Sequence, residues 1–245
     1  MAEEIEAATA VYGAILAGGA GTRMGNPDKP KQFLMLGGKP VLVHTVEKFA
    51  ISGLFDAILV LCPPDWVDQT RDLLRRYCEC GSDAIVVPGG AKRNDTIMNA
   101  IDYIRDHLPV DEDSILVTHD AVRPFVTHRI LQENLRAARQ HGACDTVMPA
   151  TDTIVESQDG RMVDIIPDRS ILYQGQTPQT FRVLELEEVL GSLDEGELSS
   201  LTDACKAYVL RGRPVALVKG DSANMKITYP EDMRIAASLL GEAHA

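Results

Sequence analysis

The stretch from Ile15 to Lys31 constrains the fold and chemistry of this chain more than any other part of its sequence. An apolar run, residues 12–17, has the length of a buried strand, and Gly18, Gly19 and Gly21 follow it directly. Glycines at the end of a strand let backbone N–H groups approach a ligand that a Cβ would hold away, and successive N–H groups form an anion-binding concavity. The stretch therefore predicts an anion-binding loop at the end of a strand.

Three cationic side chains, Arg23, Lys29 and Lys31, follow the glycines in the same loop. Phosphate is the anion that suits this set best, because Arg and Lys both pair strongly with its oxygens. The spacing excludes a Walker loop, since no Gly-Lys-Ser/Thr follows, and it lacks the Gly-x-Gly-x-x-Gly spacing of a dinucleotide site. The residues alone leave one alternative, a tight strand-to-helix turn with solvated cations.

The bulk composition excludes several other classes of protein. The chain has 245 residues, 45% of them hydrophobic, and a net charge of −12, which argues against a nucleic-acid surface. No apolar run approaches the roughly 18 residues of a membrane span, and the start of the chain lacks a basic signal-peptide region. The five scattered cysteines lack metal-ligand spacing. We therefore expect a cytoplasmic protein with one domain, residues 11–241, after an acidic extension of residues 1–10.

Apolar runs of strand length alternate with stretches of helical periodicity. The strand-like runs are residues 12–17, 57–62, 84–87, 114–118, 146–149 and 215–219. This alternation predicts an α/β fold with a mostly parallel sheet flanked by helices. Ligands of such sheets bind beyond the carboxyl ends of the strands. The polar turns 89–96 and 119–124 follow predicted strands in the same way as the glycine loop.

The pattern changes at Thr151. Residues 152–156 and 162–165 are predicted to be short strands on either side of the turn signal Asp159-Gly160. Together they predict a protruding β-hairpin arm over about residues 151–170, and residues 173–179 then lead to a helix from Val183. A two-stranded ribbon is marginal in water on its own, so we expect the arm to pack against a second copy of the chain.

Three side chains near these turns have a plain structural reading as well as a functional one. Asp120 alone could cap a helix, but beside a phosphate loop a carboxylate is a natural ligand for Mg²⁺. His119 is expected to be structural, because His is a poor ligand for Mg²⁺. Lys226 alone reads as a solvated strand lysine.

Four separated segments resemble, in the right order, the cytidylyltransferases that act on methylerythritol phosphate and ribitol phosphate. They are Leu-Ala-Gly-Gly-x-Gly-x-Arg-Met from Leu16 with Pro30-Lys31-Gln32, His-Asp-x-x-Arg-Pro from His119, Thr-Pro-Gln from Thr177, and Asn-x-Lys-Ile-Thr-x-Pro-Glu-Asp from Asn224. The resemblance runs from about Gly13 to about Leu240. It implies a Rossmann-like nucleotidyltransferase fold and a homodimer.

The resemblance also implies a role for individual residues. The expected CTP-binding set is Leu16, Ala17, Gly18, Gly19, Gly89, Gly90, Arg93, Asn94, Asp95, Thr96, Asp120 and Ala121. The expected catalytic set is Arg23, Lys31, Arg169 and Lys226, where Arg23 and Lys31 stabilise charge on the triphosphate. Asp120 would hold Mg²⁺, and Asp120, Arg169, Thr177 and Lys226 would bind the alditol phosphate. Arg169 would act either in its own subunit's site or in the neighbouring subunit's site. Many methylerythritol-phosphate enzymes have an acidic residue in the second turn, where this chain has Gly89-Gly90-Ala91-Lys92-Arg93.

Three segments, residues 89–94, 173–179 and 201–206, are more similar to the ribitol-phosphate branch of that family. The expected reaction transfers the cytidylyl group of CTP to D-ribitol 5-phosphate and releases pyrophosphate. It needs no strong general base, because the attacking monoester is already anionic at pH 7, so the protein mainly aligns two anions and neutralises charge. The alternatives are methylerythritol 4-phosphate as acceptor, UTP or GTP as donor, and a non-catalytic nucleotide-binding module.

Overall fold

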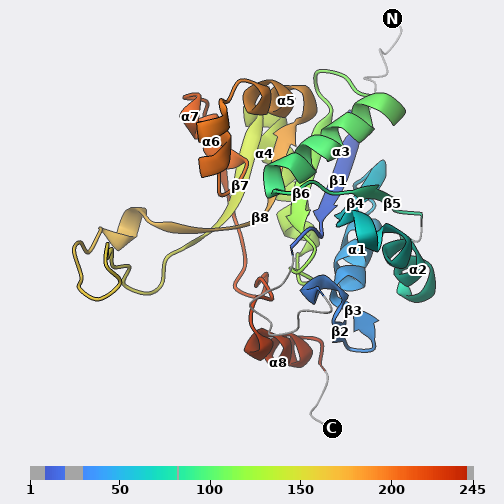
Figure 1. Cartoon of the computed structure of the whole chain (residues 1–245), viewed down its shortest axis with the longest axis horizontal. Helices are drawn as coiled ribbons and strands as arrows, with labels where there is room; N and C mark the ends of the chain where they lie inside the picture. The colour runs from blue at the N-terminus through green and yellow to red at the C-terminus, as the bar shows by residue number, and fades with distance from the viewer. Residues whose placement is uncertain (1–8, 20–29, 82, 242–245) are drawn as a thin grey trace, which may run out of the picture.

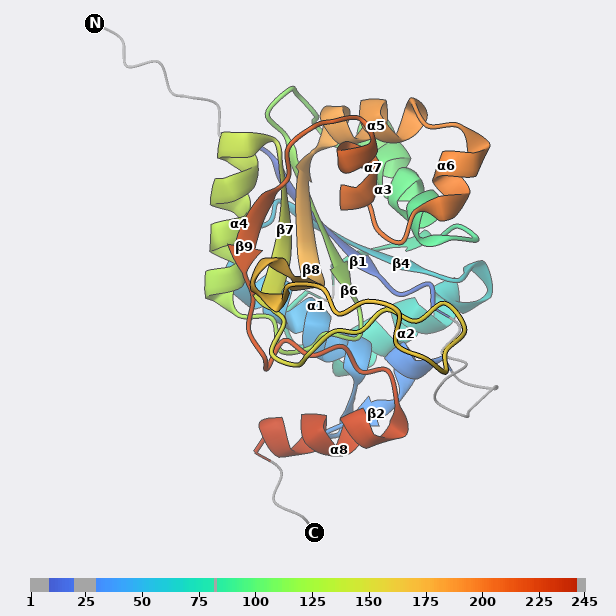
Figure 2. The ribbon, with the colours of Figure 1, turned by 90° about the vertical axis from the view of Figure 1, so that its left-hand side faces the viewer.

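The centre of the molecule is a seven-stranded sheet with helices on both faces (Figures 1 and 2). The structure is a computed structural model that describes residues 9–19, 30–81 and 83–241. The strand order is β5-β4-β1-β6-β8-β7-β9. The strands are β1 (Val11–Leu16), β4 (Ala57–Cys62), β5 (Ile85–Pro88), β6 (Ile115–Asp120), β7 (Ala143–Pro149), β8 (Tyr173–Arg182) and β9 (Ala216–Lys219).

The predicted mostly parallel sheet is confirmed. β1 pairs in parallel with β4 on one side and β6 on the other, β4 pairs in parallel with β5, and β7 pairs in parallel with β9. β1 and β6 are buried along their whole length, which explains why their sequences are near-continuous apolar runs. The carboxyl ends of β1, β5 and β6 therefore lie at one edge of the sheet, as expected.

Two apolar cores cover the two faces of the sheet. Helices α1 (Val41–Ser52), α2 (Val67–Tyr77) and α4 (His128–His141) pack on one face, and α3 (Arg93–His107), α5 (Val183–Gly191) and α7 (Cys205–Leu210) pack on the other. Neighbouring residues of β1 alternate between them, since Ile15 belongs to the first core and Leu16 to the second. Gly13 lies where a Cβ would come within 2.9 Å of the Phe49 ring, so the sheet and α1 pack closer than any larger residue would allow.

A third, smaller apolar cluster holds the C-terminal segment against the end of β6. It joins the hairpin of β2 (Met35–Leu36) and β3 (Lys39–Pro40) to α8 (Pro230–Leu239). Ile227 is fully buried in it, and its backbone N–H donates to the carbonyl of Val122 at 2.9 Å. This cluster fixes Lys226 beside the carboxyl end of β6. The remaining short helices are η2 (Lys31–Phe33), η3 (Pro64–Trp66), η4 (Arg169–Ile171) and α6 (Glu195–Ser200).

Strand β8 was not predicted, because residues 173–179 were expected to be a connection. The structure instead forms a ten-residue strand that runs antiparallel to both β6 and β7. The segment contains Gly175 and Pro178 and little apolar character, which are poor local signals for a strand. Pairing with two neighbouring strands overrides that local preference. Because β8 is antiparallel, its first half lies at the edge where β6 ends.

The arm protrudes from the ends of β7 and β8, as expected, but its two predicted strands are wrong (Figure 1). A single antiparallel bridge, Glu156 with Ile165, stands where a ladder was expected. Along the arm the side chains have little packing, since Met162 is 70% exposed and Ile166 is 62% exposed. Without a packed face, cross-strand pairs add too little to order a regular ribbon.

Candidate active site

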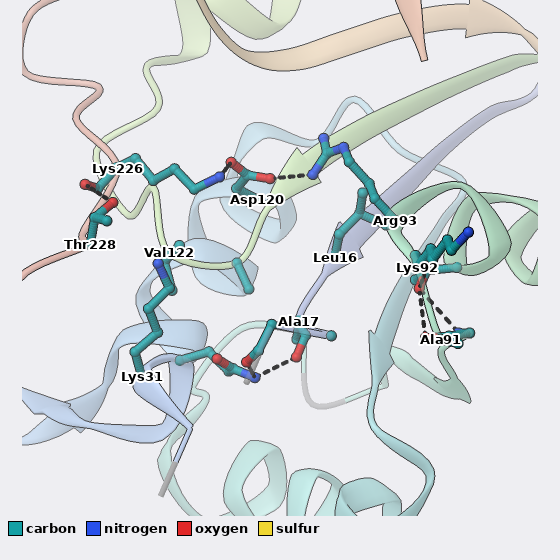
Figure 3. A pocket seen from close by; sticks show the side chains of 16 residues that line it. Leu16, Ala17, Lys31, Ala91, Lys92, Arg93, Asp120, Val122, Lys226 and Thr228 are labelled. Carbon is teal, nitrogen blue, oxygen red and sulfur yellow. Dashed lines mark hydrogen bonds and ion pairs between the residues drawn. The ribbon is translucent and has the colours of Figure 1, made fainter. Parts of the chain in front are cut away.

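A cavity of about 500 Å³ opens at the carboxyl ends of the parallel strands (Figure 3). It is lined by nine of the twelve residues predicted to bind CTP and by the predicted catalytic residues Lys31 and Lys226. They are Leu16, Ala17, Gly18, Gly19, Lys31, Gly90, Arg93, Thr96, Asp120, Ala121 and Lys226. The structure therefore brings together the glycine loop, the second glycine turn, the end of β6 and the C-terminal segment.

The glycine loop leaves the sheet along a fixed path. The Ala17 N–H donates to the Leu61 carbonyl at 2.7 Å, which extends the β1 ladder by one residue. The Gln32 side-chain amide donates to the carbonyls of Ala17 and Gly19, the latter at 3.2 Å. Gln32 was not predicted as a site residue, although it stands beside Lys31 in the Pro-Lys-Gln segment. Its contacts hold Gly18 and Gly19 against the cavity.

The second glycine turn forms because α3 begins immediately after it. The Asp95 carboxylate accepts a hydrogen bond from the Lys92 N–H at 3.0 Å, and the Thr96 hydroxyl accepts one from the Gly90 N–H at 3.1 Å. A Cβ on Gly90 would lie 2.3 Å from the Asp95 Cβ, so only glycine fits there. Gly90, Arg93 and Thr96 line the cavity, whereas Gly89, Asn94 and Asp95 are absent from its described lining.

The charge lining this cavity is opposite in sign to the net charge of the whole chain. Lys31, Lys92, Arg93 and Lys226 line it with Asp120 as the one carboxylate in that lining, among the residues the structure describes. The chain carries a net charge of −12, so this cavity concentrates positive potential on an otherwise acidic protein. An anionic ligand with several charged oxygens fits this lining.

Asp120 is the centre of the cation cluster (Figure 3). Its carboxylate, whose side chain is 8% exposed, lies 2.5 Å from Arg93 Nη1 and 2.9 Å from Lys226 Nζ. Arg123 Nε is 3.5 Å away on the same side as Lys226. Burial alone would raise the pKa of Asp120, but the charges of the three cations outweigh it and hold that pKa well below its ordinary range. The carboxylate is therefore ionised and fixes cations from α3, the β6 turn and the C-terminal segment.

Lys31, at the start of η2, links this part of the chain to the C-terminal segment. The residue is 8% exposed, and its Nζ donates to the Ile227 carbonyl at 2.8 Å. Ile227 follows Lys226 directly, so one lysine from the exit of the glycine loop is held next to the C-terminal lysine. Both lysines line the cavity, and Figure 3 shows the Lys226 ammonium directed at Asp120 and the Lys31 ammonium beside Val122.

A second, smaller cavity of about 180 Å³ adjoins the larger one and shares Arg93, Asp120 and Lys226 with it. Thr177 lines it, as does Arg123 of the His-Asp-x-x-Arg-Pro segment. Its other lining residues were not predicted as site residues. They are Gly175, Gln176, Gln179, Thr202 and Asp203. β8 contributes three of these residues. Because the strand was not predicted, these residues of the smaller cavity were not predicted either.

His119 and Thr177 hold Asp120 in place through a chain of hydrogen bonds. His119 Nε2 lies 3.1 Å from the Arg123 carbonyl, which can only accept, so Nε2 carries the proton. Nδ1 then accepts from the Thr177 hydroxyl at 3.0 Å, and that hydroxyl accepts from the Asp120 N–H at 3.1 Å. Burial lowers the pKa of His119 to about 4, and the ring stays neutral. The expected structural role of His119 agrees with this geometry, and Thr177 is engaged with the protein.

Arg169, one of the two predicted catalytic arginines, does not line these cavities. Arg23 lies outside the described residues. Arg169 is at the base of the arm, where its guanidinium donates to the Thr151 carbonyl at 2.7 Å, and it is absent from the described lining of both cavities.

Asp120 is also the candidate Mg²⁺ ligand. The described residues hold no group of three or more His, Cys, Asp or Glu side chains arranged for a metal ion. Mg²⁺ nevertheless often uses one or two carboxylates and completes its octahedron with phosphate oxygens and water. Asp120 supplies the carboxylate that such a site needs. Arg93 and Lys226 contact its two oxygens in this structure.

The whole chain is similar to proteins of one enzyme family. The sequence pattern of the IspD family, 2-C-methyl-D-erythritol 4-phosphate cytidylyltransferase, matches residues 11–242. The chain belongs to this cytidylyltransferase family. It is 50% identical, over 94% of its length and 98% of the relative's, to the ribitol-5-phosphate cytidylyltransferase of Lactiplantibacillus plantarum. The predicted enzyme class, a nucleotidyltransferase, is confirmed.

Solved structures of family members have the same fold. The 2-C-methyl-D-erythritol 4-phosphate cytidylyltransferase of Francisella tularensis superposes with a TM-score of 0.77 at 27% identity, covering 93% of this chain and 98% of that one. The 4-diphosphocytidyl-2C-methyl-D-erythritol synthase of Anaerococcus prevotii superposes with a TM-score of 0.74 at 26% identity, covering 95% of this chain and 99% of that one. The predicted Rossmann-like fold class is therefore confirmed.

The neutral His119 predicts how stability depends on pH. Its pKa in the folded state is about 4, below the ordinary value near 6.5, so the unfolded chain takes up a proton first as the pH falls. The contribution of the neutral ring to the free energy of unfolding is fully present above about pH 6.5, and it is lost as the pH falls toward 4. We expect it to account for roughly 2 kcal/mol of lost stability between pH 7 and pH 4.5.

Urea denaturation at these two pH values measures this contribution. His119→Gln should lose about 2 kcal/mol less than the wild type between them, because Gln does not titrate. The exposed His141→Gln serves as the control and should follow the wild type. Equal losses in the wild type and His119→Gln would contradict the assignment of a neutral, buried ring.

Proposed function

We propose that this protein transfers the cytidylyl group of CTP to D-ribitol 5-phosphate, giving CDP-ribitol and pyrophosphate. The observation that carries the proposal is the 50% identity, over nearly the full length of both chains, to the ribitol-5-phosphate cytidylyltransferase of Lactiplantibacillus plantarum. The product would supply ribitol for cell-surface polymers such as teichoic acid. Methylerythritol 4-phosphate is the alternative acceptor, because the family description names it.

The two adjoining cavities provide places for both substrates. The larger cavity, with its glycine loop and cation lining, suits the nucleotide, and the smaller one suits the alditol phosphate. A phosphate oxygen of the acceptor attacks the α-phosphorus of CTP in line, and the bond from that phosphorus to the pyrophosphate oxygen breaks. Arg93 and Lys226 line both cavities, so they lie where the two anions meet and offset the charge of the transition state. Lys31, with Arg23, would stabilise the departing pyrophosphate.

We propose Asp120 as the residue that holds Mg²⁺ when the nucleotide binds. The ion would supply positive charge to the triphosphate and orient its oxygens. The chain's own contribution is the carboxylate itself, which the neighbouring cations keep ionised, on a backbone fixed by the hydrogen bond from the Asp120 N–H to the Thr177 hydroxyl. Arg93 and Lys226 hold that carboxylate at the junction of the two cavities.

We propose a homodimer formed through the arm. Several arm residues expose large apolar side chains, and a single bridge orders the ribbon, so the arm gains packing only against another surface. The apolar exposed set is Val155, Met162, Val163, Ile165, Ile166 and Ile171. Arg169 at the arm's base would then reach the acceptor phosphate in the neighbouring subunit's site.

We propose the cytoplasm as the location of the enzyme. All five cysteines are free thiols, four of them buried, as is usual in a reducing compartment. In the part of the chain that the structure describes, no helix combines the length and apolar character needed to cross a membrane.

Pyrophosphate release by the purified protein tests the reaction. With CTP and Mg²⁺, D-ribitol 5-phosphate should give at least about 100-fold higher kcat/KM than methylerythritol 4-phosphate, because a site that binds hydroxyl groups rejects the wrong polyol strongly. UTP and GTP should compete weakly with CTP. A preference for methylerythritol 4-phosphate would contradict ribitol 5-phosphate as the acceptor and support the alternative. Tight CTP binding without pyrophosphate release would contradict catalysis.

Mixing two inactive variants tests the role of Arg169 across the dimer. Arg169→Ala and Lys226→Ala should each lower turnover by about 10²–10³, by analogy with the loss of one transition-state donor. In a mixed dimer, one site combines an intact Lys226 with the intact Arg169 of the other chain. Unfolding and refolding an equal mixture should therefore recover activity well above either variant alone. No recovery, or a fully active monomer by light scattering, would contradict the proposal.

A further inference from the structure

The buried side chain of Gln32 binds the glycine loop at two points. Its amide nitrogen donates to the carbonyls of Ala17 and Gly19, the residues on either side of Gly18. A carbonyl oxygen can only accept, so the NH₂ end of the Gln32 amide is the end that faces the loop. Gln32 is 1% exposed, so these hydrogen bonds are shielded from solvent.

The bond to Ala17 fixes the direction of the next N–H group. A trans peptide unit is planar, and its C=O and N–H point to opposite sides. Because Gln32 holds the Ala17 carbonyl, the Gly18 N–H of the same unit points away from Gln32. Gly18 is exposed where it lines the larger cavity, and no hydrogen bond between described residues has its N–H as the donor. That N–H is therefore available to an acceptor oxygen of a ligand.

Packing does not hold the two glycines in this conformation. A Cβ on Gly19 would meet no atom within 4 Å, and a Cβ on Gly18 would lie 3.7 Å from the Thr96 hydroxyl oxygen. Glycine has the widest choice of backbone conformations, so an unrestrained pair of glycines loses much entropy when a ligand orders it. The Gln32 bonds restrict that choice before the ligand binds, which favours binding.

The turn that carries Gln32 is anchored in the core. Phe33, the next residue, is fully buried and stacks on the ring of Trp66, with centroids 4.6 Å apart and planes 8° from parallel. The Phe33 N–H donates to the Pro30 carbonyl at 3.0 Å and closes the turn. Gln32 is therefore held independently of the loop that it binds. Trp66 is the only tryptophan of the chain, so its fluorescence reports whether this turn is intact.

We propose that Gln32 is a positioning residue for the nucleotide, and that its two hydrogen bonds set the backbone of Gly18 and Gly19 so that the Gly18 N–H meets an acceptor oxygen of CTP. This inference rests on the proposed function and goes beyond it, because it gives a role in the reaction to a residue outside the expected CTP-binding and catalytic sets. Gln32 acts through the loop, so its loss weakens CTP binding and leaves acceptor binding unchanged.

Calorimetric titration of CTP, with Mg²⁺ and without acceptor, tests the proposal. Gln32→Met keeps the length of the side chain and removes the donors, so the Kd for CTP should rise about 10- to 100-fold. The KM for D-ribitol 5-phosphate, measured at saturating CTP, should stay within about twofold. Gln132→Met, on the exposed face of α4, is the matched control and should resemble the wild type.

A purely structural role for Gln32 predicts a different result. Gln32→Met would then lower the urea midpoint of unfolding, followed by Trp66 fluorescence, and would leave the Kd for CTP unchanged. An unchanged Kd in folded Gln32→Met would therefore overturn the inference. Equal increases in the Kd for CTP and in the KM for the acceptor would also overturn it, because they would show a general distortion of the site.

Gln32→Glu gives a pH-dependent readout. A neutral carboxyl group can donate one hydrogen bond to the loop, whereas the carboxylate can only accept and repels both carbonyls. Burial raises the pKa of a carboxyl group, so this side chain should gain a proton as the pH falls from about 8 to about 6. The Kd of Gln32→Glu for CTP, divided by the wild-type Kd at the same pH, should fall about fivefold or more over that range. A ratio that stays at the Gln32→Met value throughout would contradict the proposed role.

The wild type alone decides if neither variant folds. Solvent exchange of the Gly18 amide hydrogen, measured by nuclear magnetic resonance, should be fast in the free enzyme and at least about tenfold slower with CTP and Mg²⁺ bound. The same exchange rate in both states would overturn the inference.

The proposed function and this inference fail in different ways. No pyrophosphate release from the wild type with D-ribitol 5-phosphate would contradict the proposed function itself. Normal wild-type turnover together with an unchanged Kd for CTP in Gln32→Met would contradict only the role of Gln32.

Discussion

The buried carboxylate of Asp120 is the contact on which the site depends. It lies at the end of the central strand β6 and pairs with cations from α3, from its own turn and from the C-terminal segment. Removing one partner of a buried pair typically costs about 3–5 kcal/mol, because the other charge is left without compensation. The Thr177 hydroxyl, itself bonded to His119, accepts from the backbone N–H of Asp120 and so fixes the residue that carries the carboxylate. Three distant parts of the chain are thereby brought to one point before any substrate binds.

This arrangement explains why an acidic protein can bind two anions side by side. Arg93 and Lys226 belong to both cavities, so the positive charge is concentrated at their junction. Preorganised cations at the place where charge develops are the main requirement of a reaction between a triphosphate and a phosphate monoester. The two glycine turns line only the larger cavity, whereas residues of β8 and of the segment before α7 line only the smaller one. In the proposed function, the nucleotide and the acceptor therefore meet different parts of the chain outside the shared residues.

The sequence predicts the larger cavity well and the smaller one poorly, for a physical reason. Parallel strands are apolar runs, and the turns that end them carry glycine and charge, so both signals are local. Strand β8 depends on pairing with β6 and β7, which no local pattern encodes, and its Gly175 and Pro178 argue against a strand. Gly175, Gln176 and Gln179 of β8 were consequently missed as lining residues, although Gln179 stands in the Thr-Pro-Gln segment. In the arm, two strands were predicted and only a single bridge forms. A turn signal alone does not order two strands that lack a packed face. The roles of Arg169 and Lys226 came from family resemblance, because their sequence neighbours indicate nothing about their chemistry.

The most direct test of this account is a crystal structure of the protein with CDP-ribitol bound. We expect the cytidine in the larger cavity against Gly18, Gly19 and Gly90, the diphosphate beside Arg93 and Lys226, and the ribitol chain in the smaller cavity. A ribitol chain that leaves the smaller cavity empty, or a diphosphate that does not contact Arg93 or Lys226, would contradict the division of the site into two cavities joined at Asp120.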